Sequence, residues 1–294
     1  MKILHYPIFG FLFLSIFWSA AQEKFTFPPL SPKGSISQVV GNTTISMVYE
    51  LPAARGRTVF GELVPWGEVW RTGAGNCTKI SFDKPVKVGG KNISSGIYAL
   101  FTIPDKEQWT IIFNRDTTLY GAGFYDSKKD VVRFTVMPNT TERFYETLDF
   151  DIEIIPNNAA VYISWANTQV SFPITTTTDE LVEAFIKEEL LTGRNQEYEN
   201  YVFAADYYYF QNKNLDQAIW LADKAIETGK DGGWARHVKI DVYERLQEYE
   251  QAIAELELEI AAERQRDYEK ELDRQQSMQF LQDRLSELQQ KAKE

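Results

Sequence analysis

The chain has 294 residues, 44% hydrophobic and 14% aromatic, which is enough for about two domains with cores of their own. The formal net charge of −11 lies almost entirely in residues 176–294, where 15 Lys and Arg face 27 Asp and Glu, whereas residues 22–175 carry 15 of each. Neither part is basic, so the positive surface that binds a phosphate backbone is missing, which argues against nucleic-acid binding.

Residues 1–21 read as a secretory signal peptide. Lys2 supplies the positive start, an apolar run follows from Ile8 to Trp18, and small residues place cleavage before Gln22. The run is shorter than the ~20 residues that span a bilayer, and no second candidate follows, so we expect no membrane span after cleavage. A retained anchor is the alternative. No Cys lies near the cleavage site, which argues against a lipoprotein and predicts a periplasmic or secreted protein.

Residues 22–34 are predicted to be an extended leader, because its prolines disfavour helix at their own and the preceding positions. Residues 35–175 then show short strand patterns with turns between them, among them a hairpin turn at Gly41 and Asn42. This pattern predicts an antiparallel β-sandwich-like domain. The ten predicted strands are 35–40, 43–50, 78–82, 86–88, 97–103, 109–114, 131–137, 148–154, 161–166 and 170–174.

Residues 176–262 are predicted to form a helical domain. Thr177 and Glu180 fit a capping box that starts a first helix at 179–192. Two similar segments then follow 34 residues apart, with Ala218 and Ala252 in matching positions, a period that looks like a tetratricopeptide repeat. The match is partial, because Glu259 stands at the counterpart of Ala225, no closing Pro appears, and the usual Gly is replaced by Asp206 and Ile240.

Two repeat copies are fewer than the three or so that a stable stack needs, so the first helix and the tail are expected to complete the core. The tail has no Gly or Pro after residue 254. Residues 263–294 are therefore predicted to be the charged part of one long helix, with its end solvated or paired with a partner. Its apolar residues hold no sustained heptad, so a coiled coil is weakly supported.

Histidine limits the chemistry that the chain can perform. His5 leaves with the signal peptide, and His237 is expected on the surface of a repeat helix. The β domain therefore has no His for a Ser-His-Asp or Cys-His nucleophile or for a His-rich metal site. Cys77 has no partner for an internal disulfide and is expected to be a buried strand residue. The sequence carries no cofactor motif, since Gly121 and Gly123 lack the context of a phosphate loop.

Carboxylates offer two further kinds of site. Asp149, Asp151 and Glu153 share one strand face, which is either solvated or a Ca²⁺ site. A hydrolase that uses paired carboxylates would draw on other residues, whose spacing selects no pair. These are Glu62, Glu68, Asp116 and Asp126.

The stretch from residue 55 to residue 78 combines tryptophan, arginine and glycine more densely than any other. It is either a packed structural corner or a binding face whose rings stack on sugars or peptides while arginines donate hydrogen bonds. The candidate binding residues are Arg55, Arg57, Trp66, Trp70, Arg71, Thr72 and Asn76. Burial of the rings, together with Trp109, decides between the two interpretations.

Four motifs in order resemble a bacterial family of exported proteins known only as domain of unknown function 2911. They are Ser31-Pro32-Lys33-Gly34-Ser35, Arg55-Gly56-Arg57 with Phe60-Gly61, Leu63-Val64-Pro65-Trp66-Gly67-Glu68-Val69-Trp70-Arg71-Thr72-Gly73-Ala74, and Gly96-Ile97-Tyr98-Ala99-Leu100-Phe101-Thr102-Ile103-Pro104 with Trp109-Thr110-Ile111-Ile112-Phe113-Asn114.

The resemblance covers about residues 30–174. Members usually have Gly-Ala-Asn after the Arg-Thr, whereas here Gly75 comes between Ala74 and Asn76, and Trp66 stands where Tyr is common. The resemblance implies an exported β domain, sometimes followed by tetratricopeptide-like helices. It implies no activity, because the family has none established.

Together these observations favour a non-catalytic binding or scaffolding protein of the bacterial envelope, with a protein partner bound by the helical repeats. A carbohydrate-binding module is one alternative, with a glycan as its ligand. A carboxylate-based hydrolase acting on glycan or peptide is the other.

Overall fold

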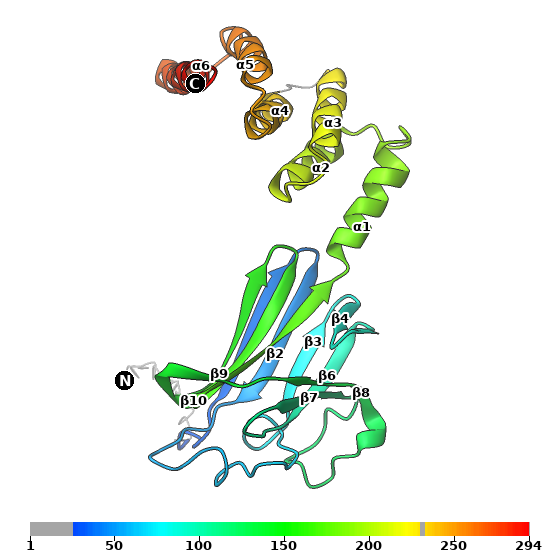
Figure 1. Cartoon of the computed structure of the whole chain (residues 1–294), viewed down its shortest axis with the longest axis vertical. Coiled ribbons are helices and arrows are strands. Elements are labelled where there is room, and N and C mark those ends of the chain that lie inside the picture. Colours follow the sequence, from blue (N-terminus) through cyan, green and yellow to red (C-terminus); the bar gives the residue numbers. More distant parts are fainter. Residues whose placement is uncertain (1–25, 230–232, 294) are drawn as a thin grey trace, which may run out of the picture.

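The computed structural model describes residues 26–229 and 233–293. Antiparallel strands fill residues 33–176, and helices follow from Thr178 to Lys291, so the predicted order of a β part and a helical part is confirmed (Figure 1). The predicted signal peptide and the first residues of the leader lie outside the described residues.

The β part consists of two antiparallel sheets. The larger has the order β1-β2-β3-β6-β7-β8 and the smaller the order β5-β4-β10-β9. The larger sheet contains β1 (Lys33–Val40), β2 (Thr43–Glu50), β3 (Thr78–Phe82), β6 (Gly96–Ile103), β7 (Trp109–Asn114) and β8 (Asp130–Val136). The smaller contains β4 (Val86–Val88), β5 (Lys91–Ile93), β9 (Asn139–Ile155) and β10 (Asn158–Thr176), and a short 3-10 turn, η1 (Ser127–Lys129), precedes β8.

The core of the β part lies between the two sheets, and alternation along the strands fills it. In β9, Leu148, Phe150 and Ile152 are buried in this core, whereas the residues between them are exposed. The alternation of Leu148, Phe150, Ile152 and Ile154 predicts one core face, which is confirmed for the first three, whereas Ile154 is 51% exposed. The residue period of two puts successive side chains on opposite faces of the sheet.

One pair of predicted strands, 161–166 and 170–174, is a single strand, β10, so the predicted break between them is wrong. Register shifts against β9 occur on both sides of Ala166, whose φ of 52° is left-handed. The polar residue Asn167 therefore marks a bulge in a continuing strand and not a turn.

The predicted boundary between leader and β part is also shifted. Strand β1 starts at Lys33, inside the predicted leader of residues 22–34.

The β part passes directly into α1 (Thr178–Phe185). The predicted capping box is wrong, since the side chain of Thr177 makes no capping hydrogen bond. The buried Thr178 fixes the junction instead, because its Oγ1 accepts the backbone N–H of Asn42 at 2.9 Å and bonds Thr176 Oγ1 at 2.9 Å. A Cβ on Gly41, whose φ is +54°, would lie 2.4 Å from that Oγ1, so only glycine lets the β1–β2 turn approach so closely.

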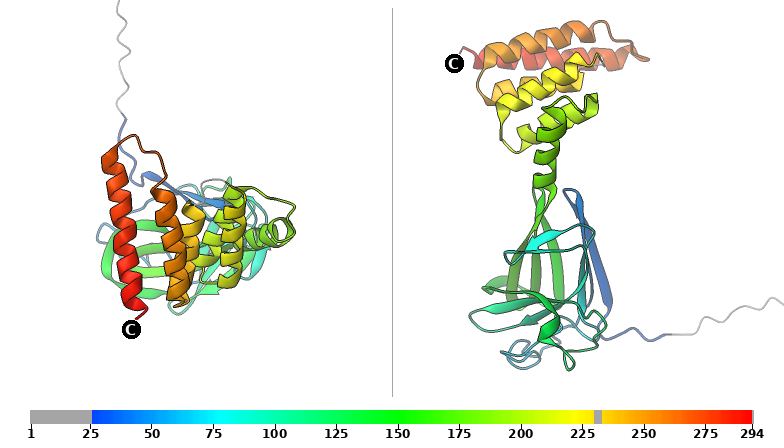
Figure 2. Two further views of the ribbon diagram at one scale, coloured as in Figure 1. Left: turned by 90° about the horizontal axis from the view of Figure 1, so that it is seen from above. Right: turned by 90° about the vertical axis from the view of Figure 1, so that its right-hand side faces the viewer.

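The helices after α1 form two hairpins flanked by further helices, and Figure 2 shows them stacked above the β part. They are a π-helical turn, η2 (Ile186–Leu190), then α2 (Tyr198–Phe210), α3 (Leu215–Glu227), α4 (Gly233–Arg245), α5 (Tyr249–Glu263) and α6 (Glu271–Lys291). Ile186 and Leu190 of η2 belong to the core of α2–α4, and Leu281 and Leu288 of α6 to that of α4–α6. The expectation that the flanking helices complete the core is therefore confirmed.

The prediction of one long helix in the tail is wrong, because the chain turns between α5 and α6. At the turn the fully buried Glu263 carboxylate is bonded by Arg266 and by the Tyr268 hydroxyl. Helix α6 then returns beside α5, and its Arg284 pairs with Asp241 of α4. One face of α6 is thus packed, with Leu281 and Leu288 buried, while most of its other residues are exposed, and the helix α5 ends without Gly or Pro.

A ladder of ion pairs crosses the interface of α4 and α5. Glu259 is 2% exposed, and Arg236 Nε lies 3.4 Å and Arg266 Nη2 3.5 Å from its carboxylate oxygens. Arg236 also pairs with Glu255 at 2.7 Å. Glu259 occupies the position that Ala225 holds in the first hairpin, so two arginines neutralise a carboxylate where the other copy has a small apolar side chain.

His237 of α4 is half-buried and not on the surface as expected. Burial lowers the pKa of His237, and Arg284 and Arg266 lower it further, whereas the carboxylates of Glu259 and Asp241 raise it.

The lowered pKa of His237 makes folding stability depend on pH. Because the unfolded state, with a His pKa of about 6.5, binds the proton more readily, the free energy of unfolding decreases as pH falls below that value. We expect the thermal midpoint of the wild type to fall more steeply between pH 7 and pH 5 than that of His237→Asn. Parallel pH profiles for the two proteins would contradict this expectation.

Candidate functional site

Arg55 and Arg57, two of the candidate binding residues, are held by the chain itself. Arg55 Nη2 donates to Leu30 O at 2.6 Å, and its backbone N–H donates to Glu146 Oε1 at 2.7 Å. Arg57 donates from Nε and Nη2 to the carbonyls of Ala54 and Ala53 at 2.9 and 2.7 Å. Planar guanidinium groups used in this way fasten the loop to its neighbours.

Trp70 lies in the centre of an aromatic cluster with Trp109, Trp165 and Phe60. It is 7% exposed, its ring stacks on Trp165 at 5.8 Å, and its Nε1 donates to Gly73 O at 3.1 Å. Trp109 is 1% exposed, so neither ring presents a face to a ligand. Trp66 is half-buried and stacks on Phe60 at 5.8 Å, which leaves it as the only one of the three rings singled out in the sequence that reaches solvent.

The remaining candidates lie in the connection between β2 and β3. Thr72 is fully buried with a φ of 53°, and its hydroxyl bonds the Thr102 hydroxyl at 3.1 Å. Arg71 is half-buried, and its Nε has no hydrogen-bond partner among the described residues. Asn76 is exposed and donates from Nδ2 to Glu50 Oε1 at 2.9 Å. The seven candidates therefore line no common cavity, although Asn76 and Glu50 share a small one of about 250 Å³.

Two of the four carboxylates considered for hydrolysis, Asp116 and Asp126, are engaged locally, whereas Glu62 and Glu68 are exposed. Asp116 accepts from Lys129 Nζ at 2.7 Å and from Thr118 Oγ1 at 2.7 Å, and these bonds lower its pKa to about 2. A carboxyl group held ionised in this way is unsuited to act as a general acid. Asp126 accepts from the backbone of Lys128 within its own turn.

Metal-binding groups are not assembled in the described ranges 26–229 and 233–293, where no cluster of three or more His, Cys, Asp or Glu side chains has suitable geometry. Asp149, Asp151 and Glu153 line an open depression on the outer face of β9, beside Arg143 and Tyr162. Cys77 is buried as predicted, and burial raises the pKa of its thiol. The thiol therefore lacks the exposure and the thiolate character of a reactive cysteine.

A cavity of about 550 Å³ lies where the β part meets the helices, and we call it the junction groove. Its floor on the β side is the β1–β2 turn with Gly41 and Asn42, together with Asn157 from the β9–β10 turn. Its walls come from α1 and α2, and its remaining lining residues are Thr178, Leu181, Val182, Phe185, Ile186, Asn200, Phe203, Ala204 and Tyr207. Domain junctions are a common place for ligand sites.

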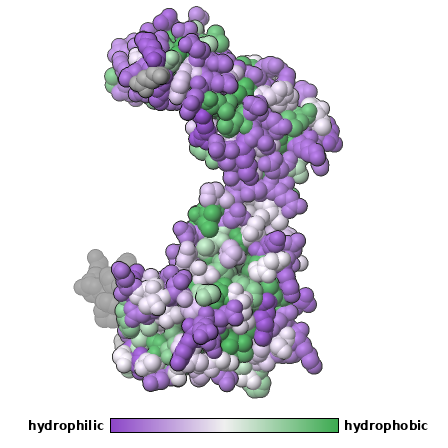
Figure 3. Space-filling view, viewed as in Figure 1, coloured by the Kyte–Doolittle hydropathy of each residue, from purple (hydrophilic) through white to green (hydrophobic). Residues whose placement is uncertain are grey.

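The walls of the junction groove expose large apolar side chains. Leu181 is 52%, Phe185 38% and Phe203 54% exposed. The apolar surface continues past the groove, because Trp234 at the start of α4 packs edge-on against Phe203 at 5.2 Å and is itself 48% exposed. In Figure 3 the molecule is hollowed between its two parts, and hydrophobic residues interrupt an otherwise hydrophilic helical surface. A contiguous exposed apolar surface of this kind marks an interaction site.

Hydrogen bonds fix the shape of the groove from both parts. Asp179 of α1 accepts from Asn157 Nδ2 at 2.7 Å and from Tyr207 Oη at 2.9 Å. One carboxylate thereby ties α1 to the β9–β10 turn and to α2. The groove is built by segments more than 100 residues apart, and no spacing within the sequence would have found it.

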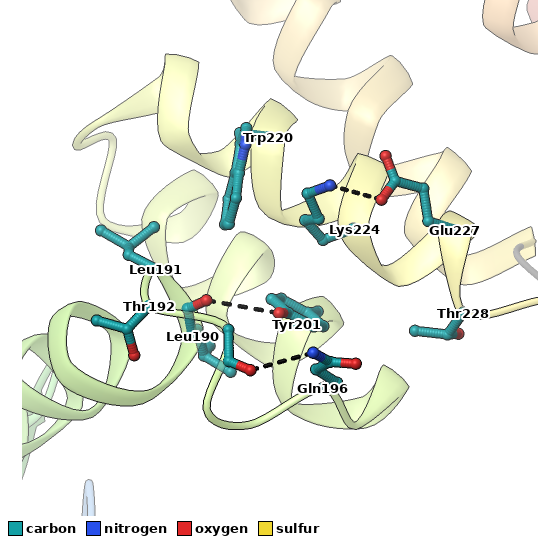
Figure 4. A pocket seen from close by; sticks show the side chains of 10 residues that line it. Leu190, Leu191, Thr192, Gln196, Tyr201, Trp220, Lys224, Glu227 and Thr228 are labelled. Atoms are coloured by element: carbon teal, nitrogen blue, oxygen red, sulfur yellow. Dashed lines mark hydrogen bonds and ion pairs between the residues drawn. The ribbon is translucent and has the colours of Figure 1, made fainter.

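A second cavity, of about 590 Å³, lies between the end of η2, the loop after it and α3 (Figure 4). Trp220 stands along one wall, and Lys224 donates to Glu227 at 2.5 Å. Tyr201 and Gln196 bond the carbonyls of Leu190 and Gly193. This cavity exposes less apolar surface than the junction groove, since Trp220 is 37% and Leu191 38% exposed.

Residues 31–174 match the sequence model of a family described as Protein of unknown function (DUF2911). The resemblance inferred from the four motifs is therefore supported over the β part. No curated protein sequence matches the chain, and no solved structure does so either. Among the described residues, no helix combines the length and the apolar character that crossing a membrane requires.

Proposed function

We propose that the protein is an exported, non-catalytic binding protein of the bacterial envelope that holds a segment of a partner protein in the junction groove. The observation that carries the proposal is the exposure of Leu181, Phe185 and Phe203 along a cavity whose shape is fixed by both parts of the chain. Apolar side chains that stay in water cost free energy, and a partner that covers them recovers it.

The arrangement of the helices supports the proposal. The hairpins α2–α3 and α4–α5 begin at residues 198 and 233, close to the 34-residue period of the sequence, and Ala218 and Ala252 are both fully buried. We infer that they are tetratricopeptide-like repeats, which present extended surfaces for polypeptides. The inference of export rests on the pattern of residues 1–21.

The alternatives have less support. Trp70 and Trp109 are buried, which leaves the half-buried Trp66 as the one ring of the three that could stack on a sugar. Asp116 and Asp126, two of the carboxylates considered for a hydrolase, bond their own loop. The junction groove offers apolar contact and fixed hydrogen bonds, which suits recognition better than bond cleavage.

A photo-crosslinking experiment tests the proposal. A crosslinking amino acid at Leu181 should give a discrete adduct in cells that make the protein, and Phe203→Asp in the same chain should reduce the adduct at least about tenfold because the groove loses an apolar contact. The matched control is the same amino acid at Leu258, which is 55% exposed on α5 against 52% for Leu181. Equal adducts at both positions, or none at Leu181, would refute the proposal.

A further inference from the structure

Three carboxylates on α1 and α2, the helices that wall the junction groove, are bonded by neutral groups. Asp179 accepts from Asn157 and Tyr207, and Glu183 accepts from the Tyr208 hydroxyl at 2.9 Å. Asp206 is bonded by the Trp234 side chain. Among the described residues, no Lys, Arg or His lies within ion-pairing distance of these three carboxylates.

The carboxylates at the interfaces of α3, α4 and α5 have cationic partners instead. Asp223 pairs with Lys239 at 2.7 Å, Glu255 pairs with both Lys239 and Arg236, and Glu259 with Arg236. The fold therefore neutralises its acidic groups at the α3–α5 interfaces and leaves those beside the groove uncompensated. A hydrogen bond from a hydroxyl or amide holds a carboxylate in place without cancelling its charge.

The surroundings of the groove add to this negative field. Besides these three carboxylates, residues 176–210, which include α1 and α2, contain five Asp and Glu but only two Lys and Arg. Burial, and then the hydrogen-bonded Asp179 carboxylate, raises the pKa of Tyr207, and burial followed by Glu183 raises the pKa of Tyr208, so both phenols stay protonated as donors to these carboxylates. An anionic surface or ligand would be repelled here, whereas a cation is attracted.

We propose that the segment held in the junction groove is a cationic amphipathic helix, with apolar side chains on Leu181, Phe185 and Phe203 and with Lys or Arg facing Asp179, Glu183 and Asp206. This inference rests on the proposed function and specifies the partner's chemistry. Apolar side chains of the partner, spaced one helical turn apart, fit a groove between two helices. Its flanking Lys or Arg side chains supply the positive charge that these carboxylates lack within the fold.

Three labelled probe peptides of about 14 residues, or four helical turns, test the inference by fluorescence anisotropy on the full mature chain. The first peptide is an amphipathic helix of Leu and Lys, and the second has Glu in place of every Lys. The third has the same composition as the first, but its sequence is scrambled so that the helix has no apolar face. We expect only the first to bind well, and to bind about fivefold more weakly when NaCl rises from about 0.05 to about 0.3 M.

Variants separate specific from general attraction. Leu181→Asp adds a negative charge, so it would strengthen non-specific binding of a cation, but it should weaken seating in the groove at least about tenfold. The isosteric double variant Glu183→Gln with Asp206→Asn should weaken binding about fivefold. The matched control Glu250→Gln with Glu257→Gln removes two exposed charges from α5 and should change binding less than twofold.

The outcomes distinguish the two proposals. Suppose that the second or the third peptide binds as well as the first, and that Leu181→Asp abolishes this binding. The groove then binds polypeptides, and the inference of a cationic amphipathic helix is overturned. If Leu181→Asp leaves binding of the first peptide unchanged, the groove is not its site, and both proposals fail for this ligand class. Equal losses from the two charge-removing variants would show attraction by net charge alone and would also overturn the inference.

Discussion

Replacing Arg236 by Leu should destabilise the helical part by about 3 kcal/mol. The substitution removes the closest cation from Glu259, which is 2% exposed, and one of two cations from Glu255. A buried carboxylate without its partner costs about 3–5 kcal/mol, and Arg266 remains near Glu259, so we expect the lower end of that range. Urea unfolding followed by far-ultraviolet circular dichroism measures the effect.

The double variant Arg236→Leu with Glu259→Ala should recover more than half of that loss. It places Ala at the position that Ala225 occupies in the first hairpin, where the residue is fully buried and needs no cation. Glu257→Ala, at an exposed site on the same helix, serves as the control and should cost little beyond a change of helix propensity. A double variant as unstable as the sum of the single variants would show that Arg236 and Glu259 do not act as a pair.

Replacing Trp70 by Ala should destabilise the β part by about 4 kcal/mol. The ring is buried among Phe60, Trp109 and Trp165, and deletion of a buried Trp leaves a cavity that the two sheets cannot close. Loss of near-ultraviolet circular dichroism during denaturant unfolding reports the aromatic cluster directly.

Trp66→Ala is the matched comparison within the same stretch. Because Trp66 is half-buried and its one aromatic neighbour is Phe60, we expect a cost of about 1 kcal/mol. Costs of similar size for the two variants would contradict the assignment of Trp70 to the core and of Trp66 to the surface.

The sequence predicts strands well where a strand ends at a true turn. Strand β7 has the predicted bounds, 109–114, because a loop with Pro104 precedes it and a polar loop follows it. It fails where a polar residue sits in a bulge, as at Asn167, since a bulge and a turn use the same residue types. It also fails at residues 264–270, where the side chains of Glu263, Arg266 and Tyr268 end a helix that local propensity would continue.

The candidate site is less predictable than the fold, for a physical reason. Residues 55–78 attract attention because tryptophan, arginine and glycine serve packing and binding equally well. Their roles depend on burial, which the sequence does not state. The junction groove is missed for the opposite reason. Gly41, Asn157 and Phe203 form no motif in the sequence, and only the fold brings them together in one cavity. The apolar residues spread around α2, among them Phe203 next to the buried Val202, were the available signal, because a helix that only packs on its neighbours needs a single apolar stripe.

The connection between the two parts has a mechanical consequence. Strand β10 runs from Asn158 to Thr176, and only Thr177 separates it from α1, so there is no slack at the connection. A partner that pulls on the helices would load β10 along its length. Its ladders to β9 and β4 lie across that direction, and many hydrogen bonds would have to shear at once. The β part would therefore resist such a pull through the combined strength of these two ladders.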